Sequence, residues 1–109
     1  MPNVYKILGQ VSPSATTPTD LYTVPAATSA VCSSISICNL AATQTSFRVS
    51  ISQGGAAITN KDYLYYDVLL AGNDTFIATI GVTLAATDKI RVYSGNSSLA
   101  FQVWGTEIT

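Results

Sequence analysis

The sequence predicts an all-β fold, a single-domain antiparallel two-sheet β-sandwich of about eight strands with a jelly-roll or immunoglobulin-like arrangement. Apolar and polar residues alternate at period two from end to end, whereas no segment repeats apolar residues at helical spacing for three turns. Turn signals recur roughly every 8 to 12 residues, as in sandwiches and barrels. A chain of 109 residues has the length of one domain, which we expect to span residues 1–109.

The expected strands cover residues 4–11, 20–24, 29–40, 45–53, 62–70, 75–84, 88–95 and 98–108. The first strand is followed by a Pro/Ser/Thr-rich stretch over 12–19, which we expect to be extended because proline cannot donate to a β-ladder. This stretch is either a crossover loop of the sandwich or an arm that lies on a neighbouring chain. The second strand is short and stops at Pro25.

In the third strand, regular alternation predicts that Val31, Ile35 and Ile37 share one face, while Cys32 and Cys38 share the other. The two cysteines are six positions apart in one strand. They therefore stand about 20 Å from each other, beyond the reach of a disulfide bond. We expect two free thiols.

The fourth, sixth, seventh and eighth strands alternate apolar and polar residues, so each is expected to have one face in the core and one in solvent. A Gly-Gly pair at 54–55 ends the fourth strand. The turn over 71–74 contains the Gly and Asn that tight hairpins need for positive φ. Arg48 and Arg91 fall on polar strand faces, where we expect them to be exposed.

The fifth strand, DYLYYDVLL, is apolar on both faces. Regular alternation places Tyr63 and Tyr65 on one side with Asp67, and Tyr66 on the other. We expect such a strand to be central in its sheet, with one face in the core and the other against a partner, because tyrosine is enriched at interfaces. The interface residues expected from the whole sequence are Tyr63, Tyr65, Tyr66, Tyr93 and Trp104.

Charged residues make up only 10% of the chain, and the net charge is −1. A typical soluble protein has about 25% charged residues, so this surface is either simply rich in Ser and Thr or partly covered in an assembly. The five basic residues are scattered, which argues against a nucleic-acid partner. No apolar run is long enough for a membrane helix or a signal peptide, so we expect no membrane partner and synthesis in a cytoplasm.

The residues that carry most enzymatic chemistry are missing or badly placed. The chain contains no histidine, which removes Ser/His/Asp and Cys/His arrangements and leaves no pattern for a metal site. Asp62 and Asp67 are five positions apart, so a regular strand would hold them on opposite faces, unlike the paired carboxylates of a glycosidase. We therefore expect a non-enzymatic protein without cofactor, metal or catalytic residues.

Four stretches resemble short virion structural proteins of tailed bacteriophages, most like those of cyanobacterial and marine phages. They are YKILGQ, TDLYTVPAATSAV, YLYYDVLLAGNDTF and LAATDKIRVYSGNSSLAFQVWGTEI, which together extend over nearly the whole chain. The resemblance implies a self-associating β-sandwich located in the virion, assembled in the host cytoplasm. Its implied role is that of a capsid decoration (cement) protein or a component of the neck, tail or baseplate.

The expected partners are therefore other copies of the chain, with a trimer favoured over a dimer, and the major capsid protein or neck and tail proteins. A second reading of the same aromatic residues is a carbohydrate-binding module for host surface glycans. In that reading Tyr63, Tyr65 or Trp104 would be the stacking platform. The sequence leaves both readings open.

Overall fold

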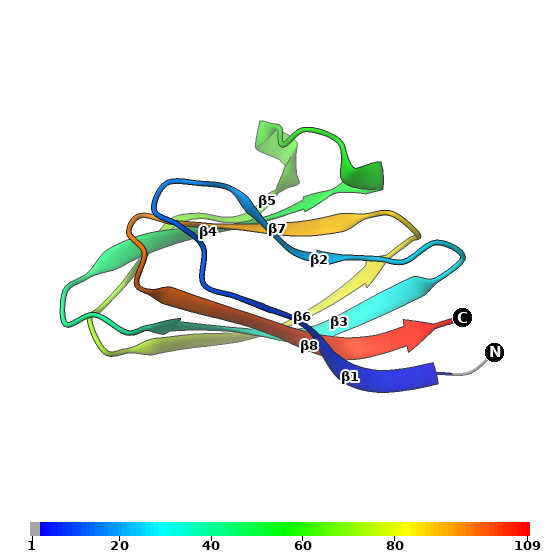
Figure 1. The fold of residues 1–109 in the computed structure, drawn as a ribbon, viewed down its shortest axis with the longest axis horizontal. Helices are drawn as coiled ribbons and strands as arrows, with labels where there is room; N and C mark the ends of the chain where they lie inside the picture. Colours follow the sequence, from blue (N-terminus) through cyan, green and yellow to red (C-terminus); the bar gives the residue numbers. More distant parts are fainter. Residues whose placement is uncertain (1–2) are drawn as a thin grey trace.

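The computed structural model describes residues 3–109 and confirms an all-β sandwich of two packed four-stranded sheets (Figure 1). Two short 3-10 turns, η1 (Gln53–Gly55) and η2 (Asn60–Asp62), connect the fourth strand to the fifth. The strands are β1 (Asn3–Val11), β2 (Thr19–Thr23), β3 (Ser29–Asn39), β4 (Thr45–Ser52), β5 (Tyr63–Leu70), β6 (Thr75–Leu84), β7 (Lys89–Ser94) and β8 (Leu99–Ile108). Each lies within two residues of its expected position.

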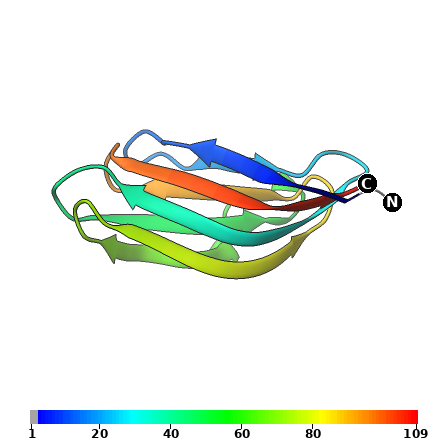
Figure 2. The ribbon, with the colours of Figure 1, turned by 90° about the horizontal axis from the view of Figure 1, so that it is seen from below.

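The strand order identifies the sandwich as a jelly roll. One sheet has the order β1-β8-β3-β6 and the other β2-β7-β4-β5, with every pairing antiparallel. Only β4 and β5 are both consecutive and adjacent, so every other connection crosses from one sheet to the other. Figure 2 shows β1 and β2 along one side of the sandwich and β5 and β6 along the opposite side. This wrapped order is the one that two interlocked Greek keys produce.

The core lies between the sheets and is centred on aromatic rings. Phe47 and Phe101 are fully buried with ring centroids 6.5 Å apart, and Phe76 lies 5.4 Å from Phe47. Each of these rings comes from an apolar position of an alternating strand, which confirms the core faces expected for β4, β6 and β8. Burial of these strand faces is the main stabilising contribution to the fold.

The expected faces of β3 are only partly correct, because the strand contains a register shift. Cys32 pairs with Gly105 but Ser34 pairs with Trp104, so Ser33 is an extra residue relative to β8. A bulge of this kind reverses the alternation that follows it. Cys32 is therefore buried on the same side as Ile35 and Ile37, while Cys38 is on the opposite, half-buried side. Both cysteines are free thiols, as expected.

The prediction that β5 is central in its sheet is wrong, because β5 is an edge strand next to β4. Its alternation is also interrupted, since Val68 pairs with Phe47 and Tyr65 with Val49. Two residues, Tyr66 and Asp67, therefore stand opposite Arg48, and Asp67 adopts a left-handed conformation with φ of 52°. A second register shift makes Leu64 an extra residue between the pairs Val49–Tyr65 and Ser50–Tyr63, so Tyr63 and Tyr65 do not share a face.

The connection between β1 and β2 crosses from one sheet to the other, and it is held to its own chain. The Thr16 N–H donates to the Ser94 carbonyl oxygen at 2.8 Å. The Ser12 hydroxyl donates to the Leu99 carbonyl oxygen at 2.9 Å. These bonds hold the stretch as a crossover loop of the sandwich, which is one of the two structures expected for residues 12–19.

Candidate interaction surfaces

Three of the five expected interface residues meet on the outer face of the β2-β7-β4-β5 sheet. The Arg48 guanidinium lies 4.2 Å from the ring centroid of Tyr66 and 4.2 Å from that of Tyr93. Tyr63 packs edge-on against Tyr66, with centroids 4.8 Å apart. Asp67 accepts from Arg48 Nε at 2.6 Å. We call these five residues the tyrosine–arginine cluster.

The tyrosine–arginine cluster is held together by its own contacts. The hydrogen bond with Asp67 raises the pKa of Arg48, so the guanidinium stays charged beside its carboxylate partner. A cation between two aromatic faces gains attraction from both rings. The β5 bulge makes this arrangement possible, because it sets Tyr66 and Asp67 side by side opposite Arg48. The cluster therefore forms a rigid aromatic patch with little free charge.

The two arginines are less exposed than expected. The side chain of Arg48 is 23% exposed and that of Arg91 is 17% exposed. Arg91 Nε donates to Asp20 at 3.0 Å, and Nη1 donates to the Ala56 carbonyl oxygen at 2.7 Å. Both arginines thus hold strands and loops of their own sheet together, and the expectation of exposed side chains is wrong.

Tyr65 and Trp104 lie apart from the cluster. Tyr65 turns toward the core, with its ring 6.0 Å from Phe47 and 5.3 Å from Phe76. Trp104 is half-buried on the outer face of the other sheet, where it pairs with Ile7 on one side and Ser34 on the other. The five aromatic residues singled out in the sequence therefore occupy three separate environments.

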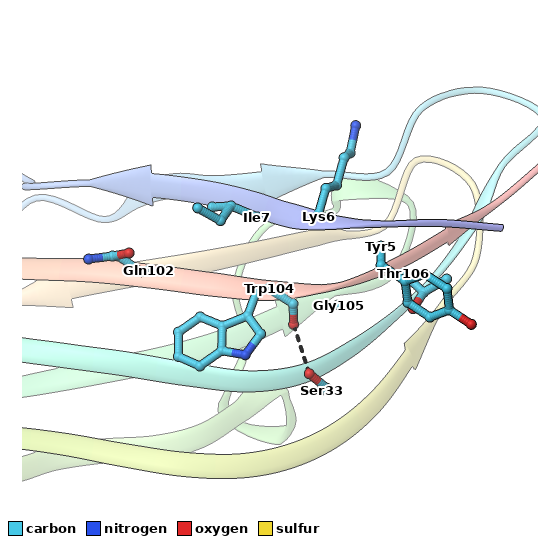
Figure 3. Close-up of a pocket in the computed structure, with 8 residues that line it drawn as sticks. All are labelled: Tyr5, Lys6, Ile7, Ser33, Gln102, Trp104, Gly105 and Thr106. Carbon is cyan, nitrogen blue, oxygen red and sulfur yellow. Dashed lines mark hydrogen bonds between the residues drawn. The ribbon is translucent and has the colours of Figure 1, made fainter.

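Trp104 lines a shallow groove of about 640 Å³ on the outer face of β1, β8 and β3 (Figure 3). Gly105 is required beside it, because a Cβ atom at this position would overlap the Val31 carbonyl oxygen of β3. This close approach occurs at the register shift around Ser33. The groove residues are Tyr5, Lys6, Ile7, Ser33, Gln102, Trp104, Gly105 and Thr106.

The outer face of the β1-β8-β3-β6 sheet is uncharged. The register sets its outward side chains in rows across the four strands, and no row contains an acidic or basic residue. The ammonium of Lys6 instead contacts Glu107 at 2.8 Å, and Glu107 accepts from the Tyr22 hydroxyl of the opposite sheet at 2.6 Å. The rows are Tyr5, Thr106, Val31 and Thr83; then Ile7, Trp104, Ser34 and Thr79; then Gln10, Gln102, Ser36 and Ile77.

The edge strand β6 lacks charge and proline, although a register shift at Ile80 and Gly81, where Gly81 has φ of 58°, introduces a bulge into it. Natural edge strands are usually blunted by charges, proline, bulges or short length. Of the four edge strands in residues 3–109, β6 is the longest and the only one without a charged residue. Ile77, the third residue of β6, is 64% exposed. Sequence reasoning did not single out this strand, although its run TFIATIGVTL lacks charge and proline.

The carboxylates have structural partners. Asp62 closes a capping box at η2, where the Thr59 backbone N–H is the main cause of its lowered pKa. Asp20 pairs with Lys89 and Arg91, and the hydrogen bond from Lys89 is the main cause of its lowered pKa. Asp88 accepts from the N–H groups of Gly54 and Ala85.

Within residues 3–109 there is no cluster of potential metal ligands. None of the helices described is long and apolar enough to cross a membrane.

Neither the models of known protein families nor the curated proteins include a match to this sequence.

Proposed function

We propose that this chain is a non-enzymatic structural protein of a phage virion, a capsid decoration protein that self-associates and stabilises the head by bridging capsid subunits. The resemblance of four sequence segments to short virion proteins is the reason for assigning the chain to a phage particle. The structure contributes a surface suited to protein contacts. In the alternative placement, the same surface serves the neck, tail or baseplate of the particle.

The observation that carries the proposal is the uncharged β6 edge beside an uncharged sheet face. A strand at the edge of a sheet presents unpaired N–H and C=O groups that a strand of another subunit can satisfy. Ile77 adds an exposed apolar side chain at this edge, and Thr79 adds an uncharged one that lies outward next to Ser34. A partner that binds at this edge removes few charged groups from water, so the desolvation cost of binding is small.

The same side of the sandwich continues onto β5, whose outer positions include more exposed apolar side chains. Leu64, Tyr66 and Leu69 are 43%, 55% and 66% exposed. Tyr65 packs on Phe76, so β5 and β6 are neighbours across the two sheets. We call the side of the sandwich that these two strands border the β5–β6 side. Leu64, Tyr66 and Leu69 lie there on one sheet, and Ile77 lies on the outer face of the other.

Bridging converts weak contacts into strong attachment. A homo-oligomer that touches several capsid subunits at once binds with avidity, because the second contact is intramolecular once the first has formed. We propose a trimer in preference to a dimer. In a trimer the contact is heterologous, so β6 of one copy meets a different surface of the next.

The first experiment is to count copies of this chain in purified particles by quantitative mass spectrometry against the major capsid protein. A ratio near one or a simple fraction supports a shell decoration protein. A handful of copies per particle supports the neck, tail or baseplate instead. Absence of the chain from particles contradicts both placements.

A pair of variants tests the surface itself. Thr79→Lys places a charge on the β6 edge and is expected to abolish self-association or particle binding while the monomer stays folded. Gln10→Lys places the same charge on β1, the other edge of the sheet, and is expected to leave assembly unchanged. Light scattering gives the mass of each variant. Assembly that survives Thr79→Lys contradicts the β6 contact.

A further inference from the structure

The groove around Trp104 has the composition of a ligand site and lies away from the β5–β6 side. Trp104 supplies a half-buried indole from β8, and the exposed side chains of Tyr5 and Ile7 flank it from β1. Figure 3 shows the indole on the outer side of the sheet, with Ser33 and Gln102 at its two ends. An apolar platform with a few polar groups around it is the usual construction of a ligand site.

The polar groups beside Trp104 are set up to bind hydroxyl groups. Gln10 Nε2 donates to Gln102 Oε1 at 3.1 Å, so the Gln102 carbonyl is occupied and its amide N–H groups remain to donate. The Ser33 hydroxyl donates to the Trp104 carbonyl oxygen at 3.2 Å, so its lone pairs remain to accept. One ligand hydroxyl can therefore accept from Gln102 and another can donate to Ser33.

The groove selects against charged ligands. Lys6 is the only charged residue that lines it. Its ammonium is paired with Glu107 at 2.8 Å, and in Figure 3 it points away from the indole. A sulfate, phosphate or carboxylate would therefore lose its hydration without gaining a free counter-charge.

The groove is open and elongated. Thr106 and Gln102, which lie at its two ends on β8, are four residues apart in the strand, or about 13 Å. This length exceeds a single sugar ring, and the open shape leaves room for a chain to continue beyond both ends.

From these observations we propose that the Trp104 groove binds a neutral oligosaccharide, with one ring stacked on the indole and ring hydroxyls bonded to Gln102 and Ser33. This site is separate from the proposed virion role and holds for the chain in any assembly that leaves β1 and β8 accessible. Among the three aromatic platforms considered from the sequence, the geometry favours Trp104, since the ring of Tyr65 packs into the core.

Trp104 is the only tryptophan of the chain, so its fluorescence reports on this groove alone. The experiment titrates the intact protein with neutral oligosaccharides of glucose, galactose, mannose, xylose and N-acetylglucosamine. An oligogalacturonate serves as the charged comparison. We expect at least one neutral oligosaccharide to give a saturable change in emission and to protect the indole from quenching by acrylamide. A panel without any saturable response overturns the proposal, as does binding of the charged oligomer alone.

Substitutions inside and outside the groove test whether the oligosaccharide binds beside Trp104. Gln102→Ala keeps the tryptophan and removes the amide donor, so we expect about fivefold weaker binding, the effect of one neutral hydrogen bond. Trp104→Ala, measured by calorimetry, is expected to weaken binding at least about tenfold. Tyr66→Ala on the opposite sheet is the matched control and should leave the affinity unchanged. Unchanged affinity in Gln102→Ala, or equal loss in Tyr66→Ala, overturns the assignment to this groove.

Discussion

One extra residue, Ser33, separates two cysteine side chains that regular alternation would place together. Cys32, before the bulge, is fully buried, and burial raises the pKa of its thiol to about 11. Cys38, after the bulge, lies on the outer, half-buried side of the same strand. A thiol reacts as its thiolate, so burial and a raised pKa both protect Cys32.

The two thiols are therefore expected to react separately. In native protein at mildly alkaline pH, a disulfide reagent such as Ellman's should modify Cys38 and leave Cys32 intact until the protein is unfolded in denaturant. Cys38→Ser should abolish the native-state reaction, and Cys32→Ser should leave it unchanged. Equal rates for both thiols in the folded protein would contradict the buried position of Cys32.

At the scale of elements, adjacent tyrosines of β5 lie in opposite environments, as strand alternation requires. Tyr65 packs on Phe47 and Phe76 in the core, whereas Tyr66 stacks on Arg48 at the surface and is 55% exposed. The register shift after Tyr65 leaves Asp67 in a left-handed conformation beside Tyr66, and Asp tolerates this conformation better than most residues do. The two rings therefore differ in burial although they are neighbours in the chain.

Neighbouring substitutions in β5 should consequently have very different effects. Tyr65→Asp buries a charge among aromatic rings and removes their packing, so we expect a loss of about 3–5 kcal/mol in the free energy of unfolding. Tyr66→Asp, its matched control, should cost less than about 1 kcal/mol. Urea denaturation followed by circular dichroism measures both. A small effect of Tyr65→Asp would place its ring outside the core.

Strand positions were predictable from the sequence because alternation is a local signal. The core rings Phe47 and Phe101 follow directly from it. Bulges and edges are not local, since they depend on which strand pairs with which, and the sequence does not contain that order in readable form. For this reason Tyr63 and Tyr65 were wrongly placed on one face, the β6 edge was overlooked, and Trp104 was noted without its groove.

At the scale of the whole molecule, one hydrogen bond joins the two sheets at a charged group. The Tyr22 hydroxyl of β2 donates to Glu107 of β8 at 2.6 Å, and Lys6 of β1 pairs with the same carboxylate. The hydrogen bond from Lys6, followed by that from Tyr22, lowers the pKa of Glu107. Burial and Glu107 raise the pKa of Tyr22, so its hydroxyl remains a donor.

This junction should make folding stability sensitive to acid. The pKa of Glu107 in the folded state lies below its unfolded value of about 4.3, so the carboxylate stabilises the fold above that pH. The stabilisation is lost as the pH falls through the folded-state pKa. Glu107→Gln should therefore be less stable than the wild type at neutral pH, with a difference that shrinks in acid. Urea titrations across this range test it, and a difference independent of pH would contradict the pKa shift.

The two outer faces of the molecule differ in charge, and this difference makes a prediction about assembly. Ion pairs occupy the face of the β2-β7-β4-β5 sheet, including Arg48–Asp67 and Arg91–Asp20, whereas the outward rows of the other sheet contain no charge. The proposed contact uses the β6 edge and Ile77, which are uncharged. Salt screens exposed charges and leaves backbone hydrogen bonds and apolar contacts largely unaffected.

Self-association is therefore expected to change little between low and high ionic strength, as measured by sedimentation of the purified protein. Arg48→Gln, which alters only the charged face, should leave the association constant unchanged, whereas Ile77→Lys should weaken it and make it dependent on salt. Dissociation of the wild type at high salt would instead indicate that the tyrosine–arginine cluster is the contact surface. Since that cluster lies on the opposite sheet, this outcome would reverse the orientation in which the sandwich meets its partners.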